Sequence, residues 1–188
     1  MENGLKYQKR VCRMSIKSLI RTVPHYPKPG IMFRDITTLL KDPVGFKNVI
    51  QELASRYRLM RVDKIVAIES RGFIFGAALA FELGVGFVPI RKKGKLPAET
   101  IGQDYALEYG IDRIEIHVDA LAEDEKVILM DDLIATGGTA SAAVSLIKSM
   151  GVNILECCFI IDLPELGGRT RLETQGQGVF ALCEFDGD

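Results

Sequence analysis

The sequence VILMDDLIATGGTA occupies residues 127–140. It begins with a continuous apolar run, Val127 to Met130, which is typical of a strand buried on both faces of a parallel sheet. Two adjacent carboxylates, Asp131 and Asp132, follow directly, so charge is expected at the point where the strand leaves the core. The stretch therefore predicts a buried parallel strand that ends at an acidic pair.

A loop of small residues separates this acidic pair from the next helical pattern. It consists of Ala135, Thr136, Gly137, Gly138 and Thr139. Glycine and small hydroxyl residues allow a sharp turn in which successive backbone N–H groups face one concavity, and the helix that follows adds a favourable partial charge. We interpret the loop as a phosphate cradle whose neighbouring carboxylates can accept hydrogen bonds from two adjacent hydroxyls, as on a ribose. An ordinary strand-to-helix turn is the alternative, whereas a Walker-type loop is not indicated because G-x-x-x-x-G-K-[ST] is absent from the sequence.

The same alternation of strand and helix runs along the chain. Apolar runs predict buried strands at residues 64–69, 86–90, 127–130 and 154–161, and a last strand at 178–185. Helical patterns follow Asp42-Pro43 as far as Tyr57 and cover residues 73–83 and 139–150. This alternation predicts an α/β fold with parallel strands and right-handed helical crossovers, in a single domain of residues 1–188.

Charged turns follow three of the predicted strands. They are Glu69-Ser70-Arg71, the basic run after Ile90, and the acidic pair. Ligands of open parallel sheets bind beyond the carboxyl ends of the strands, so these turns are expected to converge on one site.

Composition excludes several classes of protein. The chain has 188 residues, 47% apolar content and a net charge of −1, which suit one globular domain and give no global nucleic-acid footprint. Its four cysteines lack C-x-x-C spacing, so we expect neither a zinc site nor a disulfide framework. No apolar run is long enough for a membrane helix, and the basic N-terminus lacks the apolar core of a signal peptide. A soluble cytoplasmic protein without nucleic-acid or membrane partners is expected.

Three segments do not fit the alternation. Residues 1–14 are polar and basic, and we interpret them as a flexible extension. Residues 15–37 begin with a short helical face and continue into an irregular arm at 30–36. Residues 91–110 are too polar to pack and too long for an ordinary connection, which indicates a mobile lid loop. Ile114, Ile116 and Val118 then alternate with polar residues and predict a half-buried antiparallel strand, with His117 toward solvent or the edge of the core.

Five segments together resemble the type I phosphoribosyltransferases, and among them the adenine-specific branch. These segments are PKPGIMFRDIT (27–37), ESRGF (69–73), IRKKGKLP (90–97), YALEYG (105–110) and DDLIATGGT (131–139). The resemblance spans roughly residues 15–185. It implies an open parallel sheet flanked by helices, a small N-terminal hood that holds the base (15–37) and a lid at 91–110. It also implies a non-proline cis peptide at Glu69-Ser70.

The resemblance also implies a role for each matching residue. Asp131 and Asp132 would hold the ribose hydroxyls of 5-phosphoribosyl 1-pyrophosphate (PRPP). The remaining PRPP contacts would come from Ala135, Thr136, Gly137, Gly138, Thr139, Ser70, Arg71, Lys92, Lys95 and Tyr109. Phe33 would stack on the purine while backbone groups of Met32 and Arg34 read its edge. Glu108 would carry the proton exchanged with the base, and Arg71 would assist at the pyrophosphate.

The implied reaction converts adenine and PRPP to AMP and pyrophosphate, with Mg²⁺ bound mainly through donor oxygens and a homodimer as the usual assembly. Two alternatives remain open. A different base would keep the signature and change the arm, but Ala135 stands where 6-oxopurine enzymes generally have an aspartate. A regulator that binds PRPP would also keep the signature, although such proteins carry a DNA-binding module ahead of it.

Overall fold

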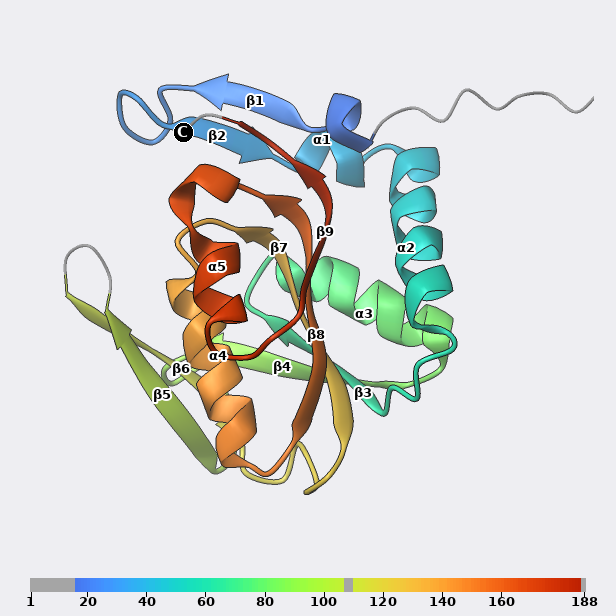
Figure 1. Ribbon diagram of the computed structural model, residues 1–188, viewed down its shortest axis with the longest axis vertical. Coiled ribbons are helices and arrows are strands. Elements are labelled where there is room, and N and C mark those ends of the chain that lie inside the picture. The colour runs from blue at the N-terminus through green and yellow to red at the C-terminus, as the bar shows by residue number, and fades with distance from the viewer. Residues whose placement is uncertain (1–15, 107–109, 187–188) are drawn as a thin grey trace, which may run out of the picture.

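The computed structural model describes residues 16–106 and 110–186. Within these residues the main sheet has seven strands in the order β5-β6-β4-β3-β7-β8-β9 (Figure 1). Five of them run parallel: β3 (Lys64–Ile68), β4 (Gly86–Lys92), β7 (Lys126–Ile134), β8 (Asn153–Asp162) and β9 (Val179–Glu184). An antiparallel hairpin, β5 (Thr100–Ala106) and β6 (Ile111–His117), extends the sheet beside β4. The expected α/β fold with an open, mainly parallel sheet is confirmed.

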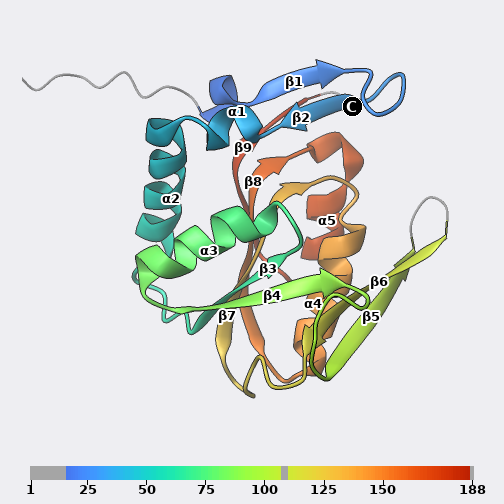
Figure 2. The same cartoon turned by 180° about the vertical axis from the view of Figure 1, so that it is seen from behind.

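Helices cover both faces of this sheet. α2 (Pro43–Tyr57) and α3 (Gly72–Leu83) pack on one face, and α4 (Gly138–Ser149) and α5 (Gly168–Glu173) lie on the other (Figure 2). Along β3, Ile65 and Ala67 belong to the core on the α2 and α3 side, whereas Val66 and Ile68 belong to the core on the α4 side. Because successive side chains of a strand point to opposite faces, a strand covered on both sides has to be continuously apolar.

The ends of two helices follow from local sequence signals. The Asp42 side chain accepts a hydrogen bond from the Gly45 N–H at 2.6 Å and precedes Pro43, the first residue of α2. Such a cap stabilises a helix by about 1 kcal/mol. α3 ends at Gly84, whose φ of +71° favours glycine. Both helix boundaries agree with the sequence-based expectation.

The hood contains more regular structure than expected. A 3₁₀ turn, η1 (Ile16–Leu19), leads into β1 (Arg21–Pro24), which pairs antiparallel with β2 (Met32–Asp35) before the short helix α1 (Thr37–Leu40). The prediction of an irregular arm at 30–36 was therefore wrong, because the partner strand lies before a proline-rich turn that hides the hairpin pattern. The hairpin lies beyond the ends of β7 and β8 (Figure 1).

Three other segments differ from expectation. β7 does not end at Met130 but continues to Ile134, because β8 pairs with it as far as Asp162. Residues 91–110, expected as a loop, contain β5, which pairs residue by residue with β6. α5 begins at Gly168, in a stretch for which the sequence analysis predicted no helix. In each case a contact with a distant segment determines the structure. Among residues 16–106 and 110–186, no helix has the length and apolar character needed to cross a membrane.

Candidate active site

The acidic pair lies near the carboxyl end of β7. Asp132 is only 4% exposed, and its Oδ2 lies 2.7 Å from Arg71 Nε, in an ion contact that lacks hydrogen-bond alignment. Asp131 Oδ1 accepts a hydrogen bond from the Asp132 N–H at 2.8 Å. Burial raises the pKa of Asp131, and the charge of Asp132 raises it further. Burial also raises the pKa of Asp132, although the guanidinium of Arg71 opposes this shift.

The turn after β3 packs directly against this pair. A Cβ on Gly72 would lie 2.8 Å from Asp131 Oδ1 and 3.0 Å from its Cα, so a side chain at this position would push the pair away. Gly72 is the first residue of α3, and Arg71 immediately precedes it. The close approach of glycine to Asp131 is what allows Arg71 to reach Asp132.

The loop after β7 is held in shape by a second segment. Gly137 has a φ of +74°, and a Cβ on it would lie 2.9 Å from the Cα of Gly168. The Gly168 N–H in turn donates to the carbonyl of Ala135 at 2.9 Å. α4 begins immediately after Gly137, and no side chain caps its N-terminus. No side-chain cap therefore satisfies the first N–H groups of α4.

A basic side chain that the sequence motifs did not indicate lies beside this loop. Arg171, in the last turn of α5, has its Nη1 3.8 Å from the position of a Cβ on Gly138. Within the loop, Thr136 is exposed, and Thr139 is half-buried in the first turn of α4. The loop is therefore flanked by hydroxyls and by one guanidinium.

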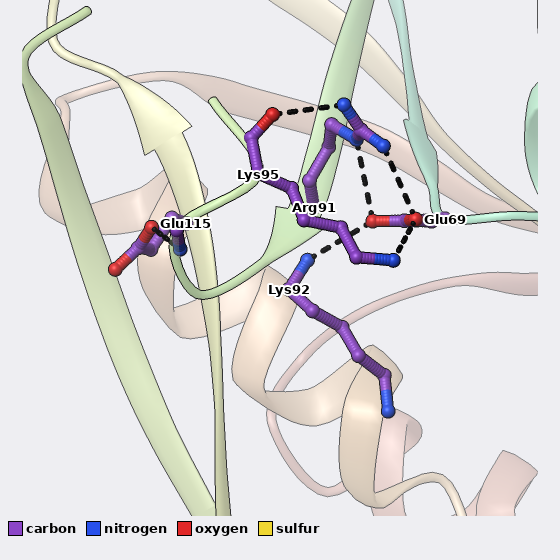
Figure 3. Close-up of polar contacts among 6 residues, drawn as sticks. Glu69, Arg91, Lys92, Lys95 and Glu115 are labelled. Atoms are coloured by element: carbon purple, nitrogen blue, oxygen red, sulfur yellow. Dashed lines mark hydrogen bonds and ion pairs between the residues drawn. The ribbon is translucent and has the colours of Figure 1, made fainter. Parts of the chain in front are cut away.

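The peptide bond between Glu69 and Ser70 is cis, as the resemblance implies. Glu69 turns toward the basic run at the end of β4, where three groups make four hydrogen bonds to its carboxylate (Figure 3). Lys95 Nζ lies 2.7 Å from Oε1, Arg91 contacts both oxygens at 3.3 Å, and the Lys92 N–H donates at 3.2 Å. Burial alone would raise the pKa of Glu69, but these donors lower it to about 2.

The basic run is a tight turn fastened from two sides. Gly94 has a φ of +76°, and its N–H donates to Glu115 Oε2 at 2.9 Å, on the side of the turn away from Glu69 (Figure 3). Lys92 Nζ pairs with Asp112 Oδ2 at 3.0 Å. The segment is not freely solvated, because its residues are held by Glu69, which directly follows β3, and by two carboxylates of β6.

The hood reaches the same site through one aromatic ring. The guanidinium carbon of Arg71 lies 5.5 Å from the centroid of the Phe33 ring, and Tyr26 meets that ring edge-on at 5.2 Å. The side chain of Arg34 points elsewhere: it donates to Thr22 Oγ1 at 2.7 Å and stacks 4.5 Å from the Phe185 ring. The side chain of Arg34 is thus engaged elsewhere. Only its backbone groups are left to contact the edge of the purine, which is the role that the resemblance implies.

The structure brings most of the expected residues together. Phe33, Arg71 and Asp132 form one chain of contacts, to which Asp131 is joined by the Asp132 N–H, and the loop 135–139 directly follows the strand that carries both aspartates. Lys92 and Lys95 belong to the basic run, and each of them contacts the carboxylate of Glu69. Glu108 and Tyr109 lie outside the described residues. A hollow of about 400 Å³ lies elsewhere and shares no residue with this site; it is lined by Ser18, Leu19, Arg21, Thr38, Lys41, Asp42 and Pro43.

Sequence reasoning missed four polar residues around the site. They are Glu69, Tyr105, Asp112 and Arg171; the sequence analysis named the first only within a charged turn and the second only within a motif, and it gave neither a role. Each contacts a site residue or loop that is distant in the sequence. For these four residues, the only signal in the sequence was that Glu69 lies at the end of a predicted strand.

A glycine-containing loop at a helix N-terminus, an acidic pair and a basic turn thus lie at the carboxyl edge of a parallel sheet, the edge at which open α/β folds bind their ligands. Residues 36–172 match the family described as "Phosphoribosyl transferase domain". The adenine phosphoribosyltransferase of Nitrosospira multiformis is 69% identical over 175 residues, which cover 93% of this chain and 100% of that protein. The corresponding protein of Nitrosomonas eutropha is 65% identical and covers 92% of this chain and 99% of its own length.

Solved structures agree with these relatives. The adenine phosphoribosyltransferase of Thermoanaerobacter pseudethanolicus has a TM-score of 0.86 at 48% identity, covering 90% of this chain and 98% of that one. The Saccharomyces cerevisiae enzyme, complexed with an imino-altritol bisphosphate and adenine, has a TM-score of 0.84 at 41% identity, covering 89% and 96%. This chain therefore belongs to the adenine phosphoribosyltransferase family.

Proposed function

We propose that this protein transfers the 5-phosphoribosyl group of PRPP to adenine, giving AMP and pyrophosphate, in purine salvage. The observation that carries the proposal is the chain of contacts Phe33–Arg71–Asp132, which joins an aromatic surface, a pyrophosphate turn and the acidic pair in one place. Transfer requires that the base, the pyrophosphate leaving group and the ribose hydroxyls are bound in one place. This arrangement offers a contact for each of the three.

The donor is held at three points in this proposal. The loop 135–139 and the first N–H groups of α4 bind the 5′-phosphate, with the partial positive charge of the helix as the main attraction. Asp131 and Asp132 accept hydrogen bonds from the ribose hydroxyls. Ser70 and Arg71 bind the pyrophosphate, which also gains positive charge from the basic turn that carries Lys92 and Lys95.

The base is held by the hood. Phe33 stacks on the purine, and backbone groups of Met32 and Arg34 read its edge. Ala135 places no charge near the base, which suits a 6-amino purine better than a 6-oxopurine. Glu108 exchanges a proton with the base as the glycosidic bond forms, and residues 91–110 act as a lid that keeps water from the oxocarbenium-like transition state.

We also propose that Mg²⁺ accompanies the donor. Among the described residues there is no group of three or more His, Cys, Asp or Glu side chains that could hold a metal by themselves. The paired carboxylates of Asp131 and Asp132 fit an ion whose remaining ligands are donor oxygens and water, since Mg²⁺ is commonly bound by one or two carboxylates plus phosphates. When bound, the ion would neutralise charge that develops on the pyrophosphate.

A homodimer and a cytoplasmic location complete the proposal. The location is supported by the free thiols of Cys157, Cys158 and Cys183, since a reducing compartment preserves them. Light scattering of the purified protein would determine the assembly, and a mass equal to one chain would contradict the dimer.

The proposed function is tested by a Mg²⁺-dependent assay of the purified protein with PRPP and, separately, adenine, hypoxanthine, guanine, xanthine and orotate. AMP formation from adenine alone is expected. Activity on a 6-oxopurine would contradict the assignments of Ala135 and the hood. Donor binding without turnover of any base would instead favour a regulatory protein.

Two variants separate the proposed roles within the site. Glu108→Ala is expected to lower kcat far more than it weakens PRPP binding, because the proton carrier acts on the base. Asp131→Ala combined with Asp132→Ala is expected to abolish donor binding measured by calorimetry. Unchanged kinetics of Glu108→Ala would remove Glu108 from the mechanism.

A further inference from the structure

The β5–β6 hairpin carries two neighbouring polar pairs on opposite faces. Tyr105 lies directly opposite Asp112 in the register, and Asp104 lies opposite Arg113. Tyr105 packs against the core on the α4 side, whereas the Asp104 side chain is 61% exposed and pairs with Arg113 at 2.9 Å. Because side chains alternate along a strand, only the first pair faces the body of the protein.

Asp112 joins three strands at this inner face. Its Oδ2 accepts the Tyr105 hydroxyl at 3.0 Å and the Lys92 ammonium at 3.0 Å, while its Oδ1 accepts the Arg113 N–H at 2.8 Å. Tyr105 also packs against the core beside α4, whose first turn carries Thr139. Asp112 therefore contacts the basic turn directly and, through Tyr105, the region of the helix that follows the phosphate loop.

We propose that Asp112 is a positioning residue of the donor site, which holds the ammonium of Lys92 in the geometry that meets PRPP and keeps Tyr105 in place beside the start of α4. The proposal rests on the proposed function of the same site. Asp112 is itself an anion and would repel phosphate, so it acts through the two side chains that it orients. Lysine has a long flexible side chain, and holding it before the ligand arrives reduces the entropy lost on binding.

A role in stability alone does not account for this cluster. The Lys92 side chain is 57% exposed and that of Asp112 23% exposed, and ion pairs with this exposure contribute little to folding. Removing the charge of Asp112 has two effects on donor binding, and these effects have opposite signs. Loss of positioning weakens PRPP binding, whereas loss of a nearby negative charge strengthens it.

The test uses Asp112→Asn, with Asp104→Asn as the matched control on the outer face of the same hairpin. Calorimetric binding of PRPP with Mg²⁺ and steady-state kinetics with adenine are measured for both variants and the wild type. Asp112→Asn is expected to raise the Kd and KM for PRPP roughly 3- to 10-fold, the range for freeing one long side chain, with kcat and the KM for adenine little changed. Asp104→Asn is expected to match the wild type.

A double-mutant cycle with Lys92→Met provides the second arm. If Asp112 acts through Lys92, Asp112→Asn changes PRPP affinity much less in the Lys92→Met background than in the wild type. Three results would each overturn the proposal. They are tighter PRPP binding by Asp112→Asn, equal effects of Asp112→Asn and Asp104→Asn, and a fully additive cycle. Wild-type protein that binds PRPP but makes no AMP would contradict the proposed function while still allowing the test by calorimetry.

Discussion

The pKa values of single carboxyl groups in this site depend on their burial and on their charged neighbours. Asp131 and Asp132 lie side by side near the end of a buried strand, and burial raises both pKa values. Glu69, by contrast, is surrounded by donors that lower its pKa to about 2. The site thus has two kinds of carboxylate: burial raises the pKa of the acidic pair, whereas the donors of the basic turn lower the pKa of Glu69.

The raised pKa values predict how donor binding depends on pH. Carboxyl groups with a raised pKa take up protons at a higher pH than ordinary aspartates, whose pKa is about 3.9. As the pH falls through this raised range, the pair loses its capacity to accept two ribose hydroxyls, so the Kd for PRPP is expected to rise. Calorimetry from about pH 8 down to about pH 5 measures this dependence.

The control for this titration is Asp131→Asn, because phosphate groups on the donor also titrate, near pH 6. That ionisation affects both proteins, whereas the step caused by the carboxyl pair should be missing or shifted in the variant. Identical profiles for the wild type and Asp131→Asn would contradict the assignment of the acidic pair to the donor.

Glu69→Gln is expected to destabilise the protein by about 1 kcal/mol at neutral pH, because it removes the anion that Arg91 and Lys95 share. The pKa of Glu69 is lowered, so its contribution to stability is present above the ordinary value of 4.5 and is lost as the pH falls toward 2. Urea unfolding at neutral and acid pH measures the difference between wild type and variant, which should shrink at acid pH.

Glu82→Gln is the matched control for this substitution. Its carboxylate pairs with Arg58 at 3.4 Å on the surface, where the two side chains are 40% and 62% exposed. A change within about 0.5 kcal/mol is expected. An equally large loss in both variants, or a loss in Glu69→Gln that does not depend on pH, would contradict the role given to Glu69.

At the scale of elements, the phosphate loop depends on close contact between two chain segments. The loop after β7 and the start of α5 approach each other at Gly137 and Gly168, with no room for a side chain on either. A Cβ on Gly168 would overlap the carbonyl oxygen of Ala135 and lie 2.8 Å from the Gly137 nitrogen. The shape of the cradle is therefore set by α5 as well as by the glycines within the motif.

Gly168→Ala is expected to destabilise the fold by roughly 2 kcal/mol, because the added methyl group meets backbone atoms that cannot rotate away. It should also raise the KM for PRPP, since the loop must shift. Gly178→Ala is the control, because a Cβ there lies 4.0 Å from its nearest neighbour, Glu156. Thermal unfolding and steady-state kinetics measure both effects, and equal behaviour of the two variants would contradict this account of the loop.

The elements differ in how well the sequence predicts them. α2 and α3 carry their own signals, such as the Asp42 cap and Gly84. β1, β5 and α5 have no comparable signal, because a short polar strand or helix is stabilised mainly by the segment that pairs with it. The acidic pair and phosphate loop were predictable because they are contiguous in the sequence, whereas the contacts of Arg171 and Asp112 were not.

At the scale of the whole molecule, one side chain connects the two ends of the described structure. Arg34, in β2 of the hood, donates to the carbonyl of Asp186 at 3.1 Å and stacks on Phe185, just after β9. The end of the described chain, just after β9, therefore lies beside β2 (Figure 1). The hood is thus fastened to the main sheet by Arg34, a residue that is 7% exposed.

Arg34→Ala is expected to raise the KM for adenine more than that for PRPP, because it releases the hood without touching the acidic pair. The loss of its hydrogen bonds should cost roughly 1–3 kcal/mol of stability. Arg21→Ala is the control, since Arg21 pairs with Asp35 in the same hairpin with its side chain 59% exposed. Equal changes in both KM values, or equal effects of the two variants, would contradict a specific role of Arg34 in holding the hood.

The sequence by itself determined the buried strands, the main helices, the acidic pair and the phosphate loop, because each depends on residues that are adjacent or one helical turn apart. Only the tertiary structure decided that Glu69 holds the basic turn, that Asp112 joins Lys92 to Tyr105, and that Gly168 shapes the cradle. These contacts join residues that are distant in the chain, and their geometry follows from the order and register of the strands. Local patterns carry no information about that register.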